Sequence, residues 1–159
     1  MANPVYLTIN SLQQGLISAG CGSQSSIGNK MQAAHPDEIM VLSVNHGMTR
    51  IQNVNHQTLD VRKPVDKSSP LLMSAINNNE ELTCELAFWR TNRAGMNENF
   101  YIVKLVKARI AQISFMLPHV INNPGGQPEE GVSFTYESIM IEHCVAGTSA
   151  YSFWDSRVM

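Results

Sequence analysis

The fold is decided by residues 62–79, which read R-K-P-V-D-K-S-S-P-L-L-M-S-A-I-N-N-N. Ser68 or Ser69 can cap a helix here, because a serine hydroxyl accepts a hydrogen bond from a first-turn backbone N–H. Pro70 then falls in the first turn, where its missing N–H would have no partner inside the helix. Asp66 precedes the start, where the helix dipole favours a negative charge. One apolar stripe follows, formed by Leu71, Leu72, Ala75 and Ile76. The asparagines at 77–79 favour the turn that ends this one short helix.

The remaining apolar patterns have the period of β-strands. The predicted strands cover residues 5–10, 39–44, 58–62, 82–90, 100–117, 132–141 and 150–154. In the longest one the inward face changes, from Ile102 and Val106 to Ile113 and Phe115, which predicts a β-bulge near Ala108. We expect a flexible glycine- and serine-rich loop at 20–28, a long exposed loop at 48–57, a hairpin turn at 91–99 and a loop at 118–131.

About seven or eight strands and one helix predict a mainly β fold: an antiparallel β-barrel or two-sheet sandwich with one flanking α-helix. The length of 159 residues suits a single domain over residues 1–159. Charged residues make up only 15% of the chain, which lowers the cost of burying its surface against other proteins. The net charge of −2 argues against a nucleic-acid partner.

Cysteine number and apolar runs give two further expectations. Cys21, Cys84 and Cys144 are odd in number and widely spaced, which predicts reduced thiols rather than disulfides or a zinc site. The N-terminus lacks the pattern of a cleaved signal peptide, and no apolar run is long enough for membrane insertion.

The ionisable residues form no recognised catalytic or metal-binding pattern. The five histidines (35, 46, 56, 119 and 143) have no metal-ligand spacing, and no nucleophile elbow occurs. The acidic pairs Glu80-Glu81 and Glu129-Glu130 are interpreted as solvated charge beside turns, and Trp89 and Trp154 as packed aromatic residues. We therefore predict no enzyme activity, no cofactor and no metal site.

The stretch K-P-V-D-K-S-S-P-L-L at 63–72 resembles the Hcp family, the haemolysin-coregulated proteins of bacterial type VI secretion. The motif positions are Lys63, Pro64, Asp66, Lys67, Ser68, Ser69, Pro70 and Leu71. The segments F-Y-I-V-K-L (100–105), A-R-I (108–110) and V-S-F-T-Y-E-S-I (132–139), with a final hairpin reaching Trp154, also fit. The resemblance covers nearly the whole chain.

The resemblance implies a phage tail-tube-like subunit of the type VI inner tube in a Gram-negative bacterium. Six copies would form a ring, and stacked rings would form a tube inside a contractile sheath, with a spike protein at its tip and effector proteins carried in its lumen. The chain would assemble in the cytoplasm and be secreted without a cleaved signal peptide. Some family members carry a fused toxin domain. Because this chain ends at Met159, just after the last predicted strand, we expect a bare tube subunit.

Ring and tube contacts are expected in the loop at 48–57 and beside it, because this loop is long and poor in charge. The candidate residues are His46, Met48, Gln52, Asn53, Asn55 and His56, and the loop at 118–131 is a second candidate. Two functions of other classes compete with the tube subunit. One is a small secreted effector enzyme. The other is a monomeric β-sandwich ligand-binding module with a groove at Trp89 and Tyr101.

Overall fold

The computed structural model describes residues 3–154, so the expectation attached to Met159 lies outside the described part. Within it the helices are α1 (Gln24–Ile27), the 3-10 turn η1 (Gly28–Lys30) and α2 (Ser68–Asn77). The strands are β1 (Val5–Ser11), β2 (Gly15–Leu16), β3 (Ile39–Val41), β4 (Ser43–Asn45), β5 (Met48–Arg50), β6 (Val54–His56), β7 (Leu59–Pro64), β8 (Leu82–Thr91), β9 (Asn97–Met116), β10 (Glu129–Thr135), β11 (Ser138–His143) and β12 (Thr148–Phe153).

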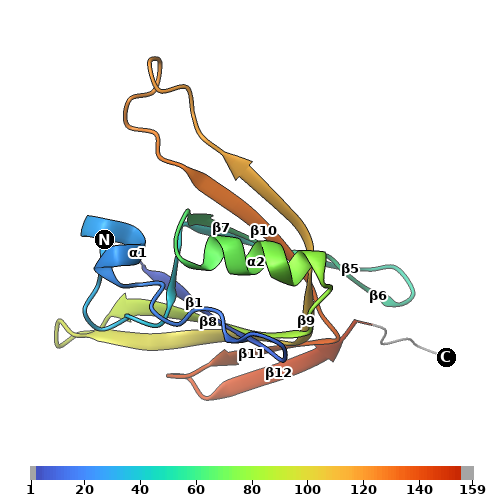
Figure 1. Cartoon of the computed structure of the whole chain (residues 1–159). Coiled ribbons are helices and arrows are strands. Elements are labelled where there is room, and N and C mark those ends of the chain that lie inside the picture. Colours follow the sequence, from blue (N-terminus) through green and yellow to red (C-terminus); the bar gives the residue numbers. More distant parts are fainter. Residues whose placement is uncertain (1–2, 155–159) are drawn as a thin grey trace.

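The strands form a branched antiparallel sheet with the order β2-β1-β8-β9-β10-β7-β4. β11 pairs with β9 and β12, β3 pairs with β1, and β5 and β6 form a separate hairpin. Segment 39–45 meets both ends of the path, but β3 pairs only with β1 and β4 only with β7, so the sheet is not a closed barrel. The predicted mainly β, antiparallel fold is confirmed in its open, two-sheet form (Figure 1).

Strand β9 bends in its middle, so it joins the β1–β8–β11 part of the sheet to the β10–β7–β4 part. Its first half pairs with β8 and β11, and its second half pairs with β10. Lys107 has φ 50°, and the register against β8 shifts between Leu82 and Cys84, which confirms the predicted bulge near Ala108.

The predicted inward face of β9 is wrong except at Ile113, which packs against the core. Val103, Leu105, Ala108 and Ile110 are buried, whereas Val106 is 37% and Phe115 68% exposed. Both faces of this segment are apolar, so the period of two identified a strand without choosing its inner side.

Helix α2 is where residues 62–79 predicted it. Leu72 and Ala75 are buried in the core, and Leu71 and Ile76 pack against it, which confirms the apolar stripe. The helix is followed by Asn79 in the left-handed conformation, with φ 50°. Figure 1 shows α2 lying along the body between the β7–β10 strands and the β1–β8 strands.

Several predicted loops contain regular structure. Residues 48–57 form the hairpin β5–β6 rather than an irregular loop, and the Gly/Ser loop at 20–28 includes α1. Gly22 lies so close to residue 35 that a Cβ there would be 2.0 Å from the His35 carbonyl oxygen, so this loop is packed at that point. The strand predicted at 132–141 is two strands, β10 and β11. The hairpin was missed because β5 is exposed throughout and β6 buries only His56, so its sequence has no apolar alternation.

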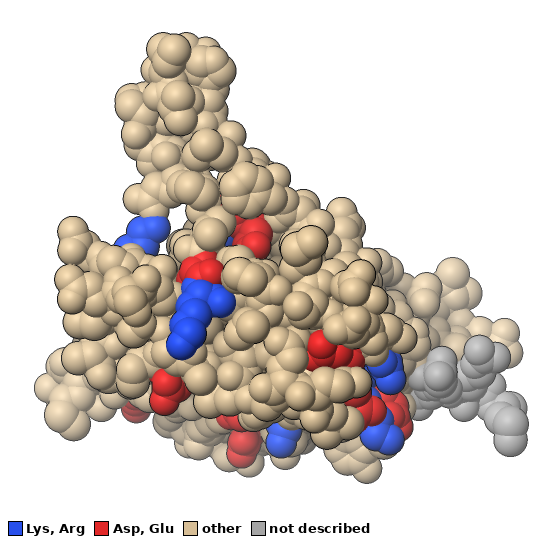
Figure 2. Space-filling view, in the orientation of Figure 1, with Lys and Arg blue, Asp and Glu red and all other residues tan. Residues whose placement is uncertain are grey.

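A long hairpin projects from the body, and we call residues 110–133 the arm. It consists of the second half of β9, the first part of β10 and the loop 117–128 between them, and it rises clear of the rest of the molecule in Figure 1. No Lys, Arg, Asp or Glu occurs from residue 110 to 128, and Figure 2 shows the projection without charged colours beyond its base.

Within the described residues, no helix combines the length and the apolar character needed to cross a membrane.

Candidate functional site

The motif residue Lys63 is completely buried, at 0% exposure, on the inner side of β7. Its Nζ donates to Asp66 Oδ1 at 3.0 Å, to the Pro64 carbonyl oxygen at 3.1 Å and to the carboxylate of Glu130. The interpretation of Glu130 as solvated charge is wrong, since this residue is only 5% exposed. Burial of an ammonium group requires such partners, because an unpaired buried charge is very costly.

Asp66, rather than Ser68 or Ser69, provides the cap of α2. Its Oδ1 accepts hydrogen bonds from the backbone N–H of Ser68 at 2.9 Å and from the Ser68 hydroxyl. In return the Ser69 hydroxyl accepts from the Asp66 N–H at 3.1 Å, a reciprocal arrangement like a capping box. The predicted serine caps lie after Asp66 in the chain, because the sequence did not show that helical geometry already begins at Lys67 (φ −61°, ψ −27°).

Together these side chains form a buried charge cluster of Lys63, Asp66, Ser69 and Glu130. Ser69 Oγ donates to Glu130 Oε1 at 2.7 Å, so the cluster joins β7, the start of α2 and the base of the arm in β10. One cation faces two carboxylates, and Asp66 Oδ2 is buried without a hydrogen-bond partner. The cluster fixes the helix and the arm to the same strand.

The other motif residues lie around this cluster. Pro64 is buried in β7, and Pro70 is exposed in the first turn of α2. Lys67 is exposed, and its backbone N–H donates to Ser26 Oγ at 2.8 Å, which attaches the early loop to the helix start. Leu71 is partly buried against the core.

Glu80, the residue after the asparagine turn, is buried at 2% exposure, so its interpretation as solvated charge is also wrong. Its carboxylate accepts from Ser11 Oγ at 2.5 Å and from Gln14 Nε2 at 2.9 and 3.0 Å. Burial acts to raise the pKa of Glu80, but hydrogen bonds from Ser11, Gln14 and Asn78 outweigh it, and the pKa is lowered. Because Glu80 lies far from Ser11 and Gln14 in the sequence, no local pattern predicted these hydrogen bonds.

The candidate contact residues fall into two groups on the β5–β6 hairpin. Met48, Gln52 and Asn55 are exposed, and Asn53 is partly exposed, so these four lie on the hairpin itself. His46 and His56 lie at its root, where His56 is only 6% exposed. The structure therefore brings together four surface positions and two positions that hold the hairpin on the body.

The root of the hairpin is built around Tyr136, although no sequence pattern places this residue there. Its hydroxyl lies 2.7 Å from His46 Nε2 and 2.7 Å from His56 Nδ1. Since a hydroxyl carries one proton, it can donate to at most one of the two imidazoles. His56 Nε2 also meets Ser152 Oγ at 3.0 Å, and its ring stacks on Trp154 with centroids 5.7 Å apart.

Burial, followed by the proximity of His56, lowers the pKa of His46 below its ordinary value of 6.5 despite the opposite effect of Asp60. Burial raises the pKa of Tyr136 to about 12. Both pKa shifts favour the neutral form, of the His46 imidazole and of the Tyr136 hydroxyl.

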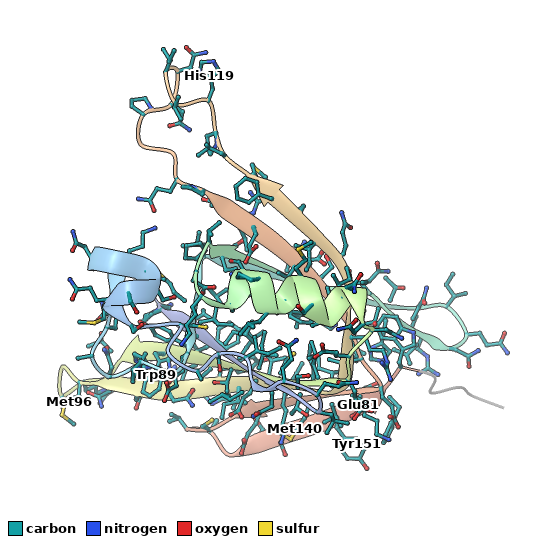
Figure 3. All side chains as sticks on the ribbon, in the orientation of Figure 1. Glu81, Trp89, Met96, His119, Met140 and Tyr151 are labelled. Carbon is teal, nitrogen blue, oxygen red and sulfur yellow. The ribbon has the colours of Figure 1, made fainter. Side chains whose placement is uncertain are left out.

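The arm carries the apolar surface of the second candidate loop. Phe115, Leu117, Val120 and Ile121 are 68, 49, 63 and 80% exposed. Its tip is ordered by His119, whose Nδ1 accepts from the N–H groups of Ile121 and Asn122 at 3.3 and 3.2 Å. Figure 3 shows His119 at the far end of the arm. Because these apolar side chains are largely exposed in the single chain, this surface suits a contact with another protein.

The aromatic residues of the predicted ligand groove contact other residues of the same chain. Trp89 packs edge-on against His35 with centroids 5.2 Å apart, and Tyr101 packs against Phe88 at 5.5 Å, so these aromatic residues do not share one groove. In residues 3–154 no three His, Cys, Asp or Glu side chains gather as metal ligands would. The three cysteines are free thiols, as predicted.

Comparison with known proteins identifies the family. The family model described as type VI secretion system effector, Hcp, matches residues 6–143. The major exported protein of Pseudomonas aeruginosa is 37% identical over 99% of both chains. The uncharacterized protein YhhZ of Escherichia coli is 38% identical over 93% of this chain, which spans 37% of YhhZ.

Solved structures agree with this assignment. A crystal structure of an Hcp protein has a TM-score of 0.91 at 32% identity, covering 98% of this chain and 99% of the other. The secreted protein Hcp3 from Pseudomonas aeruginosa has a TM-score of 0.88 at 35% identity, covering 98% and 100%. These matches confirm the resemblance seen in residues 63–72, and the chain belongs to the Hcp family of type VI secretion proteins.

Proposed function

We propose that this chain is the subunit of the type VI inner tube, in which six copies close into a ring and rings stack into a tube. The observation that carries the proposal is the arm, a projecting hairpin with no charged residue from 110 to 128 and with largely exposed apolar side chains. A projection of this kind is stable in water when a neighbouring copy covers it. Family membership supports the same role.

The tube would assemble in the cytoplasm, leave the cell with a spike protein at its tip, and carry effectors in its lumen. Export is supported by the name of the Pseudomonas aeruginosa relative, a major exported protein. No catalytic step is assigned to the chain.

The oligomeric state tests the proposal directly. Light scattering at several concentrations, with negative-stain images of the same peak, should give annular particles of six times the 17.6 kDa chain mass. A monomer at every concentration would contradict the tube role and favour a ligand-binding module.

We further propose that the β5–β6 hairpin contacts the next ring or the sheath. Met48, Gln52, Asn53 and Asn55 would make the contact, and His46 and His56 would hold the hairpin in place through Tyr136. Replacing residues 50–54 by a two-residue Asn-Gly turn should leave rings intact and abolish stacked tubes in electron micrographs. Full-length tubes from this variant would rule the contact out, and the arm loop at 118–131 would be shortened next.

A further inference from the structure

The root of the β5–β6 hairpin brings three side chains with metal-binding atoms to one point. His46 Nε2 and His56 Nδ1 each lie 2.7 Å from the hydroxyl oxygen of Tyr136. Neutral imidazole is the commonest metal ligand in proteins, and a tyrosine oxygen becomes an anionic ligand when it loses its proton. Because the third donor is a tyrosine, this group differs from the clusters of His, Cys, Asp and Glu that the described residues lack.

The spacing of the three atoms is close to what one ion requires. Ligand atoms bound at about 2.0–2.2 Å around one ion lie roughly 3 Å from each other. The two contacts of 2.7 Å therefore need to open only slightly to admit an ion between the imidazoles and the phenol oxygen. As the metal–oxygen bond forms, the Tyr136 hydroxyl releases its proton to solvent.

The surroundings of His56 hold its ring in the orientation that a metal ligand needs. Its second nitrogen, Nε2, lies 3.0 Å from Ser152 Oγ, and its ring stacks on Trp154 with centroids 5.7 Å apart. A metal-bound histidine usually donates its other ring N–H to such a partner, which leaves the first nitrogen free to bind the ion. The ring is also only 6% exposed, so it has little freedom to turn away.

A pocket beside His46 leads from solvent to this point. It is lined by Asn45, His46, Gly47, Gln57, Thr58 and Asp60. The Asp60 carboxylate acts to raise the pKa of His46, so its negative charge also attracts a cation to the pocket. The Gln57 carbonyl oxygen, 3.5 Å from the Tyr136 hydroxyl oxygen, is a further donor close to the same point.

The donor atoms select the class of metal. Imidazole nitrogens suit zinc, copper and nickel, whereas calcium and magnesium prefer sites made of oxygen atoms. The other three histidines do not combine in this way. His35 Nδ1 contacts Glu38, and His119 and His143 each accept a hydrogen bond from a backbone N–H of their own turn.

We propose that His46, His56 and Tyr136 bind one divalent transition-metal ion of the class of Cu²⁺ or Zn²⁺. Positions 46 and 56 flank the β5–β6 hairpin, which Figure 1 shows extending from the body, so the ion would close the base of this hairpin. No spacing rule predicts the site, because Tyr136 lies 80 and 90 residues from its two partners. All three ligands belong to one chain, so the proposal is independent of ring assembly.

Calorimetric titration of the tag-free chain with Zn²⁺ tests the site. We expect one ion per chain in the wild type, and binding at least about 100-fold weaker in His46→Asn and in Tyr136→Phe, because even the loss of a residue that orients a ligand costs 10–100-fold. His119→Asn removes an exposed histidine from the arm and should bind like the wild type. A wild type that binds no zinc would overturn the proposal. Equal binding by all variants, which indicates an adventitious ion only, would do the same.

Copper identifies the ligands directly. A tyrosine oxygen bound to Cu²⁺ gives a charge-transfer absorption band that a tyrosine with a purely structural role does not give. The wild type and His119→Asn should show this band, and Tyr136→Phe should lack it. Ser152→Ala should keep the band but bind copper about 10–100-fold more weakly, because only the partner of His56 is lost. A wild-type chain loaded with one copper ion and without the band would refute the assignment of Tyr136.

Amide hydrogen exchange on the wild type provides a test without variants, should His46→Asn or Tyr136→Phe fail to fold. Saturating Zn²⁺ should slow exchange in residues 46–57, because the ion closes the base of the hairpin, and leave α2 and β8 unchanged. Zinc binding that leaves residues 46–57 unaffected would place the ion elsewhere and contradict the proposed site.

Discussion

Replacing Lys63 with methionine tests the buried charge cluster, because it removes the only cation from between two carboxylates. Lys63 Nζ contacts both Asp66 and Glu130, and the Lys63 side chain is 0% exposed. Methionine preserves much of the apolar volume of the lysine side chain, so any loss of stability reflects the missing charge rather than a cavity. Asp66 and Glu130 would then face each other without compensation.

The expected loss follows from the burial of the pair. Removing one partner of a buried ion pair costs about 3–5 kcal/mol, because the remaining charge stays desolvated. For a chain of this size each kcal/mol corresponds to about 2–4 °C, so the unfolding midpoint should fall by roughly 6–20 °C.

Arg62 provides a matched control on the same strand. Its guanidinium pairs with Glu129 at 3.5 Å, but its side chain is 45% exposed. Exposed pairs contribute about 0–1 kcal/mol, so Arg62→Met should change stability little. Both variants should be unfolded by urea at several protein concentrations, because ring assembly adds stability by mass action.

A double-mutant cycle separates the charge pair from other effects. Glu130→Gln in the Lys63→Met background removes one of the two uncompensated carboxylates, and part of the lost stability should return. The coupling energy should reach about 0.5–3 kcal/mol. A loss below about 1 kcal/mol in Lys63→Met, equal to that in Arg62→Met, or strictly additive effects would refute the role given to the cluster.

Four further measurements address other parts of the chain. Gly22→Ala should destabilise by about 1–3 kcal/mol, because a Cβ would lie 2.0 Å from a carbonyl oxygen, whereas Gly125→Ala, with open space around it, should stay near wild type in urea unfolding. Equal effects of the two would contradict the close packing. Because the pKa of Glu80 is lower in the folded chain than its ordinary 4.5, its stabilisation is present above pH 4.5 and is lost as pH falls through the folded value. Glu80→Gln should flatten this acid limb of stability against pH, and an unchanged limb would exclude Glu80 as its source. The lowered pKa of His46 favours the neutral imidazole in the folded chain, so stability should fall as pH drops below 6.5, and His46→Asn should reduce that slope. A thiol reagent should label only Cys144 in the native chain, since the other two thiols are buried, and modification of all three before unfolding would contradict that placement.

Local patterns predicted α2 and β8 correctly, because each has one face that meets the core. Helix α2 combines a first-turn proline, an apolar stripe and an asparagine turn, and each of these acts within a few residues. β8 alternates cleanly for the same reason, with Leu82, Cys84 and Leu86 buried. The β5–β6 hairpin escaped prediction because it buries only His56 and so shows no apolar alternation. Most of the inner face of β9 was misassigned because both of its faces are apolar.

The partners of buried polar groups were beyond local patterns. Glu130 beside a turn looks solvated in the sequence, yet it lies 67 residues from the lysine that it binds. Tyr136 joins two histidines 80 and 90 residues away, although no spacing rule connects them. Such contacts depend on the register of β10 against β7, and a slip of one residue would turn Glu130 away from Lys63.

The sequence by itself determined the family motif, the helix, most strands and a mainly β antiparallel fold, because these follow from short-range periodicity and turn chemistry. Only the tertiary structure decided that Lys63, Asp66 and Glu130 form one cluster, that the hairpin root rests on Tyr136, and that β9 and β12 keep open edges on opposite sides of the body. The physical reason is that strand pairing brings together residues far apart in the chain, and the edges left unpaired are known only when every other pairing is in place.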